Sequence, residues 1–403
     1  MKTERIIFVV FLFLFAVGCV SNKTNKIDEL KPIVNNKKTI NIELLNNKTD
    51  YKLEPIKLSE FVDSVKFIII EETKESLIKD INNVFFTQEY IIAVDNALHT
   101  IFFFDWNGKY VRKISRRGQG PGEYLSISSS MFDEQKQELI IYDISSKSVL
   151  FYDMYGNFAR KISEFSENTV IRDIINLPNG HFLCYRYDGV GGSADKKYIG
   201  LWEVDGNGKF VRNLFTYHVN FPVVYGTSAH LRQISKETIS LRDHIHDDIY
   251  HINYQNGIVE KFISYNKKGN KLSQLIGADV EMLRKNQNIR SYIVQEKGNY
   301  VITYWFDEES PPKLLFSLFS KNTNKVRYWD AFYSYDTTIS GVLHIPVNSN
   351  RPDILVCGLN RIIIDDYLSD KNLPELVRDS LMSLSTKLGN SENPVLELLY
   401  IKK

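Results

Sequence analysis

The residues best suited to chemistry are the histidines and aspartates of "DHIHDDIYH" (243–251). His244 and His246 are separated by one residue, so on a strand both would point to the same face, and His251 follows closely. Imidazole and carboxylate groups are the ligands that zinc and similar divalent metals take in proteins. The stretch is also rich in turn-forming residues, which predicts a hairpin with solvated side chains. We therefore expect no cofactor, and we keep a divalent metal at these histidines as the alternative.

A second candidate is the glycine-rich stretch "RRGQGPGEY" (116–124). A glycine loop that binds phosphate lies between a strand and a helix, whose first N–H groups contact the phosphate. Here strand-like sequence follows, and the Lys-Ser/Thr pair of a P-loop is missing, so we interpret the stretch as a turn. Arg116 and Arg117, with Tyr124 as a stacking neighbour, form a candidate site for an anionic ligand such as a carboxylate or uronate. In the alternative interpretation both arginines are solvated or bridge neighbouring units.

Other sources of chemistry are scarce. The sequence holds no G-x-S-x-G, H-E-x-x-H or paired-cysteine metal motif, and no carboxylate pair is marked as glycoside-cleaving, so we predict no catalytic residue. Cys184 and Cys357 lie in apolar, strand-like runs and are predicted to be buried free thiols, with a disulfide between them as the alternative. Lys and Arg total 50 against 49 Asp and Glu, so there is no basic excess that favours nucleic acid.

The N-terminal residues predict export from the cytoplasm and attachment to a membrane. A short basic start precedes the apolar run Ile6–Val17, which is too short to span a bilayer, since that takes roughly 20 residues. The run ends in "AVGC", which resembles a bacterial lipobox with a lipid-carrying thiol at Cys19. We expect residues 1–18 to be a lipoprotein signal peptide and residues 19–50 to hold the lipidated cysteine and a polar tether. An ordinary signal peptide followed by an incidental cysteine is the alternative.

An internal repeat dominates the rest of the chain. Glu89–Ile114 and Gln137–Ile162 align without a gap, and Trp202–Leu214 repeats the end of the pattern. The shared positions are Asp105, Gly108 and Arg112 in the first copy, Asp153, Gly156 and Arg160 in the second, and Asp205, Gly208 and Arg212 in the third. Asp-x-x-Gly between short β-branched and aromatic runs is typical of a hairpin turn. The repeat therefore predicts several units of antiparallel strands.

These units predict the fold class. Four short strands in a unit of about 50 residues are typical of a propeller blade. Residues 51–403 are therefore predicted to be an all-β domain: a six-bladed β-propeller of four-stranded antiparallel blades. Short helices are expected at Asp279–Asn286 and Leu373–Leu388, and seven blades is the alternative count. Val65–Ile70 and Pro394–Lys403 lack partners of their own. We expect both to join the last blade, so that the N- and C-terminal strands close the ring.

The same segments carry a family resemblance. "RRGQGPGEY", the repeated "DxxGxxxRKI" pattern, "VKFIIIEETKESLI" and "ENPVLELLYIKK" resemble the six-bladed β-propeller lipoproteins, which are related to NHL-repeat propellers. The resemblance spans roughly Tyr51–Ile401, and "GQGPGEY" and "NPVL" are its most specific parts. It implies the six-bladed fold, a location in the bacterial cell envelope and lipid attachment. It brings no general activity, so no catalytic residue is carried over.

Two functions of different classes follow. We expect a monomeric lipoprotein, anchored to the membrane through Cys19 and facing the periplasm or the cell surface, that binds a peptide, a glycan or a partner protein without catalysis. The loop Tyr187–Tyr198 and the propeller rims are the places where such a scaffold carries binding function. The alternative is a propeller enzyme, a lyase or hydrolase, with a metal or a carboxylate pair in the central channel.

Overall fold

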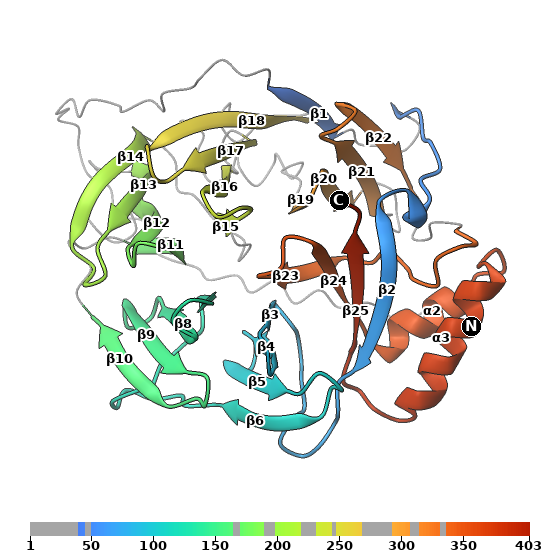
Figure 1. Cartoon of the computed structure of the whole chain (residues 1–403), viewed down its shortest axis with the longest axis horizontal. Helices are drawn as coiled ribbons and strands as arrows, with labels where there is room; N and C mark the ends of the chain where they lie inside the picture. Colours follow the sequence, from blue (N-terminus) through green and yellow to red (C-terminus); the bar gives the residue numbers. More distant parts are fainter. Residues whose placement is uncertain are drawn as a thin grey trace, which may run out of the picture.

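The computed structural model is built of β-sheets that surround a common centre (Figure 1). The structure describes residues 39–44, 50–163, 170–188, 198–218, 231–243, 247–267, 292–306, 314–330 and 336–403. Within each sheet the strands lie side by side, one after another from the centre outward. The observed architecture is all-β and propeller-like, in agreement with the predicted class.

Three four-stranded antiparallel sheets follow the sequence repeat. The first sheet contains β3 (Asn83–Phe86), β4 (Ile91–Asp95), β5 (Thr100–Phe104) and β6 (Tyr110–Ile114). The second sheet contains β7 (Ser129–Asp133), β8 (Glu138–Asp143), β9 (Ser148–Asp153) and β10 (Phe158–Ile162). The third sheet contains β11 (Val170–Asn176), β12 (Phe182–Asp188), β13 (Tyr198–Val204) and β14 (Phe210–His218). In each, the first strand lies nearest the centre and the fourth lies outside (Figure 1).

The remaining strands repeat this order with additions. The fourth sheet contains β15 (Leu231–Gln233), β16 (Thr238–Asp243), β17 (Asp248–Asn253), β18 (Ile258–Lys267) and, outside them, β1 (Ile40–Leu44). The fifth sheet contains β19 (Tyr292–Lys297), β20 (Tyr300–Phe306), β21 (Leu314–Ser320) and β22 (Lys325–Trp329). The terminal sheet contains β23 (Pro346–Ser349), β24 (Ile354–Leu359), β25 (Val395–Ile401) and β2 (Val62–Ile69).

The repeated Asp-x-x-Gly motifs form the turns between third and fourth strands, as predicted. In the second sheet, Asp153 Oδ1 accepts the N–H groups of Tyr155 and Asn157, both at 2.8 Å. Gly156 then takes a φ of 83°, which residues with a Cβ rarely adopt. Asp105 and Asp205 accept the corresponding N–H groups in the first and third sheets. One turn chemistry therefore sets the outer hairpin of all three sheets.

An early strand and the last strand of the described chain pair in the terminal sheet. β2 pairs antiparallel with β25 from Val62 opposite Ile401 to Ile69 opposite Val395, and Figure 1 shows the two strands side by side. On the inner side, β23 pairs in parallel with β3 through Asn348 and Ser349, which links the terminal sheet to the first sheet. Each strand that the sequence left without a partner is thus paired.

Part of the segment expected to be a polar tether is a strand. β1 lies parallel to the outer strand β18, with Ile40 opposite Ile263 and Leu44 opposite Lys267. Ile42 and Leu44 are fully buried. Their burial explains the difference: the segment is polar on average, but its alternating apolar side chains cover the edge of the fourth sheet. The predicted boundary at residue 50 is therefore wrong at this end of the domain.

Two α-helices are present in the described residues. α3 (Glu375–Leu388) corresponds to the predicted helix at 373–388 and begins after Pro374. α2 (Arg361–Ser369) is not among the predicted helices, because the isoleucines of its "RIII" start favour a strand by composition. Asn360 begins α2 by accepting the N–H of Ile363 at 2.9 Å. The candidate helix Asp279–Asn286 lies outside the described residues. Neither α2 nor α3 has the length and apolar character needed to cross a membrane.

Both predicted core thiols are buried and free. Cys184 is 2 % exposed on β12, and Cys357 is fully buried on β24. The two cysteines belong to separate hydrophobic clusters, which fits the prediction of packed thiols rather than a disulfide.

Candidate functional site

The stretch "RRGQGPGEY" connects β6 of the first sheet with β7 of the second and is a turn, as predicted. Its fold is fixed by bonds within the stretch, from the N–H of Gly118 to the Tyr124 carbonyl and from the N–H of Tyr124 to the Arg116 carbonyl, both at 3.0 Å. Gly122 has a φ of 70°, and a Cβ there would lie 2.6 Å from Phe158. The glycine thus allows the turn to pack closely over β10.

The three candidate ligand residues of this turn are placed differently. Arg116 and Arg117 are exposed, whereas Tyr124 is fully buried. The Tyr124 hydroxyl donates to the backbone carbonyl of His99 at 2.8 Å, and burial raises the pKa of this phenol to about 12. Because no part of its ring reaches the surface, Tyr124 cannot be the stacking neighbour that the sequence suggested.

The histidine-aspartate cluster is only partly described. His244 and His246 lie outside the described residues, so the metal alternative stays a prediction. His251 Nε2 lies 3.1 Å from Glu296 Oε2, and its ring stacks on Phe262 with centroids 4.0 Å apart. Asp243, Asp247 and Asp248 are at most 2 % exposed, so the expectation of solvated carboxylates is wrong. In the ranges that the structure describes, no three His, Cys, Asp or Glu side chains gather as metal ligands.

The innermost strands are joined by a chain of polar contacts around the centre. Going round the sheets, the contacts are Asn83 Nδ2 to Ser130 Oγ (2.7 Å), Ser129 Oγ to Asp173 Oδ1 (2.8 Å), Leu231 N to Asp173 Oδ2 (2.8 Å), Arg232 Nη1 to Gln295 Oε1 (2.7 Å), Gln295 Nε2 to Asn348 Oδ1 (3.4 Å) and Asn348 N to the Asn82 carbonyl (3.2 Å). Amide, hydroxyl and guanidinium groups dominate this circuit. These contacts hold neighbouring sheets together and line the centre.

A buried amine completes this central region. Lys297, at the end of β19, is 5 % exposed and donates to Ser349 Oγ at 3.0 Å and to the Arg351 carbonyl at 2.6 Å. Burial lowers the pKa of Lys297 to about 7, and the charge of Arg232 adds to the effect. The amine is used in packing the fifth sheet against the terminal sheet.

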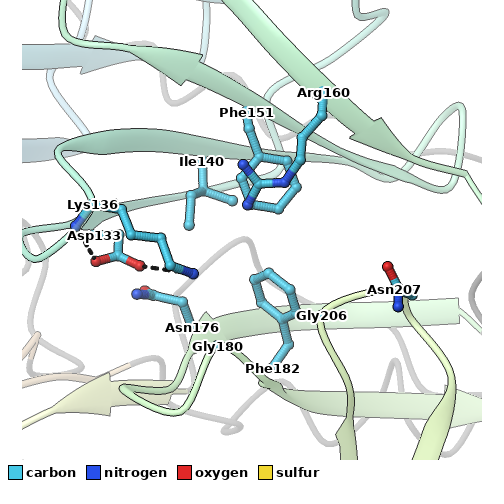
Figure 2. A pocket seen from close by; sticks show the side chains of 10 residues that line it. All are labelled: Asp133, Lys136, Ile140, Phe151, Arg160, Asn176, Gly180, Phe182, Gly206 and Asn207. Atoms are coloured by element: carbon cyan, nitrogen blue, oxygen red, sulfur yellow. Dashed lines mark hydrogen bonds and ion pairs between the residues drawn. The ribbon is translucent and has the colours of Figure 1, made fainter.

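A cleft of about 230 Å³ opens between the second and third sheets (Figure 2). We call this interface the second junction. The residues that line the cleft are Asp133, Lys136, Ile140, Phe151, Arg160, Asn176, Gly180, Phe182, Gly206 and Asn207. Figure 2 shows Ile140, Phe151 and Phe182 across its interior, with polar side chains on both sides.

Strand register explains how these side chains meet. In the second sheet Met131, Ile140, Phe151 and Arg160 are direct cross-strand partners, one from each strand, and form the Arg160 row. In the third sheet Asn176, Phe182, Val204 and Phe210 are partners in the same way and form the Phe210 row. Direct partners point to the same face of a sheet. The rings of Phe151 and Phe182 meet edge to face at 6.1 Å, so the two rows face each other.

The junction between the first and second sheets, which we call the first junction, has the same construction and is filled. Its two facing rows are Phe85, Ile92, Phe103 and Arg112 from the first sheet and Phe132, Leu139, Tyr152 and Phe158 from the second. All of these apolar side chains pack in one cluster. At the second junction the positions of Phe132 and Tyr152 are taken by the smaller Asn176 and Val204. Asn176 itself lines the cleft, and Val204 is the direct partner of Phe182, which lines it as well.

The repeated arginine also behaves differently at the two junctions. Arg112 lies over the rings of Tyr90 and Phe103, both at 4.5 Å, and donates to the Met154 carbonyl of the next sheet. Arg212 makes the equivalent bond to the Tyr254 carbonyl at 2.6 Å.

Arg160 departs from this pattern. It stacks on Phe151 at 3.6 Å, and its hydrogen bond among the described residues goes to Glu138 Oε1 of its own sheet at 2.5 Å. The equivalent of Met154 at this junction is Gly206, which also lines the cleft. Arg160 therefore borders the cleft instead of bridging the junction.

The cleft offers both donors and acceptors around an apolar interior. Asn176 and Asn207 provide amide groups, Lys136 and Arg160 provide cations, and Asp133 provides a carboxylate. Lys136 Nζ lies 3.8 Å from Asp133 Oδ2, and Arg160 is paired with Glu138. The charges thus balance within the site. This arrangement suits a small ligand with several polar groups and no large net charge.

A second cleft of about 610 Å³ lies at the junction of the third and fourth sheets, and its residues are engaged with each other. Glu203 accepts from Arg212 Nε at 2.6 Å and lies 2.7 Å from His181 Nδ1. Burial acts to raise the pKa of Glu203, but the hydrogen bonds from His181 and Arg212 hold it below its usual value. Because Arg212 also bonds to Tyr254, its guanidinium is committed to the fold.

Neither cleft was found from the sequence, although one signal was present. The third Asp-x-x-Gly turn reads "DGNG" where the second reads "DMYG", so Gly206 replaces Met154 in the repeat. Asn176 and Val204 carry no comparable signal, because their partners become known only with the strand register.

Among the comparisons with known proteins, one solved structure supports the fold. A predicted exported protein of Bacteroides fragilis, known as a crystal structure, matches with a TM-score of 0.70 at 17% identity, over 90% of this chain and 100% of that one. A member of the DUF4221 family from Bacteroides vulgatus matches with a TM-score of 0.48 at 11% identity, over 85% of this chain and 97% of that one. No functionally curated protein matches the sequence at a significant level. A family model matches residues 37–400, and the chain therefore belongs to the family described as Domain of unknown function (DUF4934).

Proposed function

We propose that the protein is a binding module that holds a neutral, hydroxyl-rich ligand, such as one sugar unit of a glycan, in the cleft of the second junction. The observation that carries the proposal is the departure of this junction from the repeat. Smaller side chains open a space there, and Arg160 lines it instead of bridging to the next sheet. The same repeat fills the first junction with apolar side chains. An open second junction is therefore not required by the fold, and this supports a binding role.

The chemistry of the lining supports a sugar-like ligand. A hydroxyl both donates and accepts hydrogen bonds, and the cleft presents amide, carboxylate, ammonium and guanidinium groups close together. The volume of about 230 Å³ is below the roughly 300–1,000 Å³ typical of drug-sized pockets, so the cleft accommodates a single ring-sized unit. The aromatic edges of Phe151 and Phe182 provide an apolar floor. A peptide or a partner protein would have to insert one small polar side chain at the same place.

We also propose the finer architecture and address. The five sheets and the terminal sheet would be six blades, with β2 and β25 closing the ring in the last one. Support comes from the polar circuit of the inner strands, and from Asn393, which is fully buried and donates to the Glu71 and Ser76 carbonyls at 3.0 and 2.7 Å. The resemblance to NHL-like propeller lipoproteins and the "AVGC" motif support a lipid anchor at Cys19 and a place in the bacterial cell envelope.

The experiment uses a variant that fills the mouth of the cleft. Asn207→Trp places a large ring there, while the backbone N–H bond to Asp205 at 2.9 Å does not depend on the side chain. Asn107→Trp is the matched control, because Asn107 holds the same position in the turn of the first sheet, with the same bond at 2.8 Å. We expect a glycan array of neutral and acidic saccharides to reveal neutral binders that Asn207→Trp loses and Asn107→Trp keeps.

Absence of any saccharide binding by the wild-type protein contradicts the proposal. Equal binding by both variants contradicts the location.

A further inference from the structure

The outer end of the second junction carries an exposed aromatic residue, whereas the residue at the same position of the first junction is packed under a turn. Phe210 begins β14 and is 43 % exposed, although Phe182 and Val204 of the same row are buried. Its equivalent at the first junction, Phe158, is packed against Tyr152 and lies directly beneath Gly122 of the interblade turn. Part of the Phe210 side chain is therefore open to the surface, whereas Phe158 lies under a turn.

This ring is on the same face of the third sheet as the cleft. Phe182 lines the cleft and is the direct partner of Val204, which is the direct partner of Phe210. Because direct partners share a face, Phe210 lies on the same side of the third sheet as the cleft, two strands farther out than Phe182. In the facing row of the second sheet, the outermost member is Arg160, which lines the cleft. Arg160 and Phe210 are thus the outer members of the two facing rows.

Trp202 supports Phe210 from the neighbouring strand. The two rings meet edge to face with centroids 5.2 Å apart. Trp202 lies two residues from Val204 along β13, which places it on the same face. An aromatic side chain held by a second ring loses little conformational freedom when a ligand packs on it.

The cleft beside Arg212 is not part of this surface. Glu203 is the partner of Arg212 and alternates with Trp202 and Val204 along β13, so both charged residues point to the opposite face of the third sheet. A ligand that extends outward from the cleft of the second junction therefore meets Phe210 and Trp202, not the Glu203–Arg212 pair.

We infer that the ligand is an oligosaccharide of at least two units, with one unit in the cleft and the next stacked on Phe210 beside Trp202. This inference rests on the proposed function and adds the length and direction of the ligand. The ring in the cleft would be recognised through its hydroxyl groups, and the second through its apolar face. Stacking on an aromatic ring contributes a modest, measurable part of affinity.

The test measures affinity against chain length by titration calorimetry. The probes are glucose and galactose homo-oligomers of one to four units, together with the same length series of the best binder from the glycan array. We expect affinity to rise by roughly three- to tenfold from one unit to two and to change little afterwards. Phe210→Ala should remove that gain while leaving the affinity of the single unit unchanged.

Val211→Ala is the matched control. Val211 is the next residue of β14, is also 43 % exposed and lines the other cleft, so its loss should leave every affinity unchanged. Equal affinity for one and two units, or an equal effect of both variants, overturns the inference while the proposed function stands. Absence of binding by every saccharide overturns both together. Thermal unfolding of each variant, expected to match the wild type, shows whether the fold is retained.

Discussion

The first and second junctions use one construction and reach opposite results. At the first junction Phe132, Tyr152 and Phe158 fill the space between two sheets, and Arg112 bridges to the next turn. At the second junction the smaller Asn176 and Val204 take two of these positions, a cleft is open beside Asn176, Phe210 is exposed, and Arg160 bonds within its own sheet. The difference teaches that smaller side chains at one interface of a repeat can accompany an open cleft there.

The largest expected effect comes from opening the first junction. Tyr152 is fully buried and its hydroxyl donates to the Gly122 carbonyl at 3.0 Å. Tyr152→Val copies the residue of the second junction and leaves both a cavity and an unpaired carbonyl. We expect the free energy of unfolding to fall by about 3 kcal/mol, measured by chemical denaturation. An unchanged stability would show that the filled junction contributes nothing to the fold, and the comparison would lose its basis.

The repeated arginines should differ by a smaller amount. Arg112→Ala removes the contacts with two rings and a charge-assisted bond between sheets, so a loss of about 2 kcal/mol is expected. Arg160→Ala removes a half-exposed ion pair within one sheet and should cost less than about 1 kcal/mol. The same change should weaken ligand binding, whereas Arg112→Ala should not. Equal destabilisation by the two variants contradicts the assignment of different roles.

The smallest expected effect on stability comes from filling the second junction. Val204→Tyr introduces the residue of the first junction next to Phe182, which lines the open cleft of about 230 Å³. We expect the free energy of unfolding to change by less than about 1 kcal/mol, because new packing offsets the local rearrangement. Binding should fall at least tenfold in a calorimetric titration. A Val204→Tyr protein that is stable and binds as well as the wild type would show that the cleft is not the site.

Much of the fold follows from the sequence because each unit of the repeat carries the same turn-forming residues. Asp153 and Gly156 predict a hairpin from their residue types alone, and the structure contains it. The periodic apolar residues of α3 also reveal the helix directly. α2 is hidden because Ile362, Ile363 and Ile364 favour a strand by composition, and only the cap at Asn360 and the packing of Ile364 decide for the helix.

The site follows from the sequence much less. Arg116, Arg117 and Tyr124 attract attention because their types can bind an anion, but a fully buried Tyr124 removes the stacking partner. The cleft depends on Val204 and Asn176, which are ordinary residues in themselves. They matter because they stand where the first junction has larger side chains, and this equivalence is known only from the strand register. Such a site is visible only when two junctions are compared in three dimensions.

The most direct measurement is a crystal structure of the protein soaked with its best-binding disaccharide. We expect one ring in the cleft, with hydroxyl groups near Arg160 and Asn207, and the second ring over Phe210. A disaccharide at the centre of the sheets, or beside Arg116 and Arg117, with an empty cleft would contradict it.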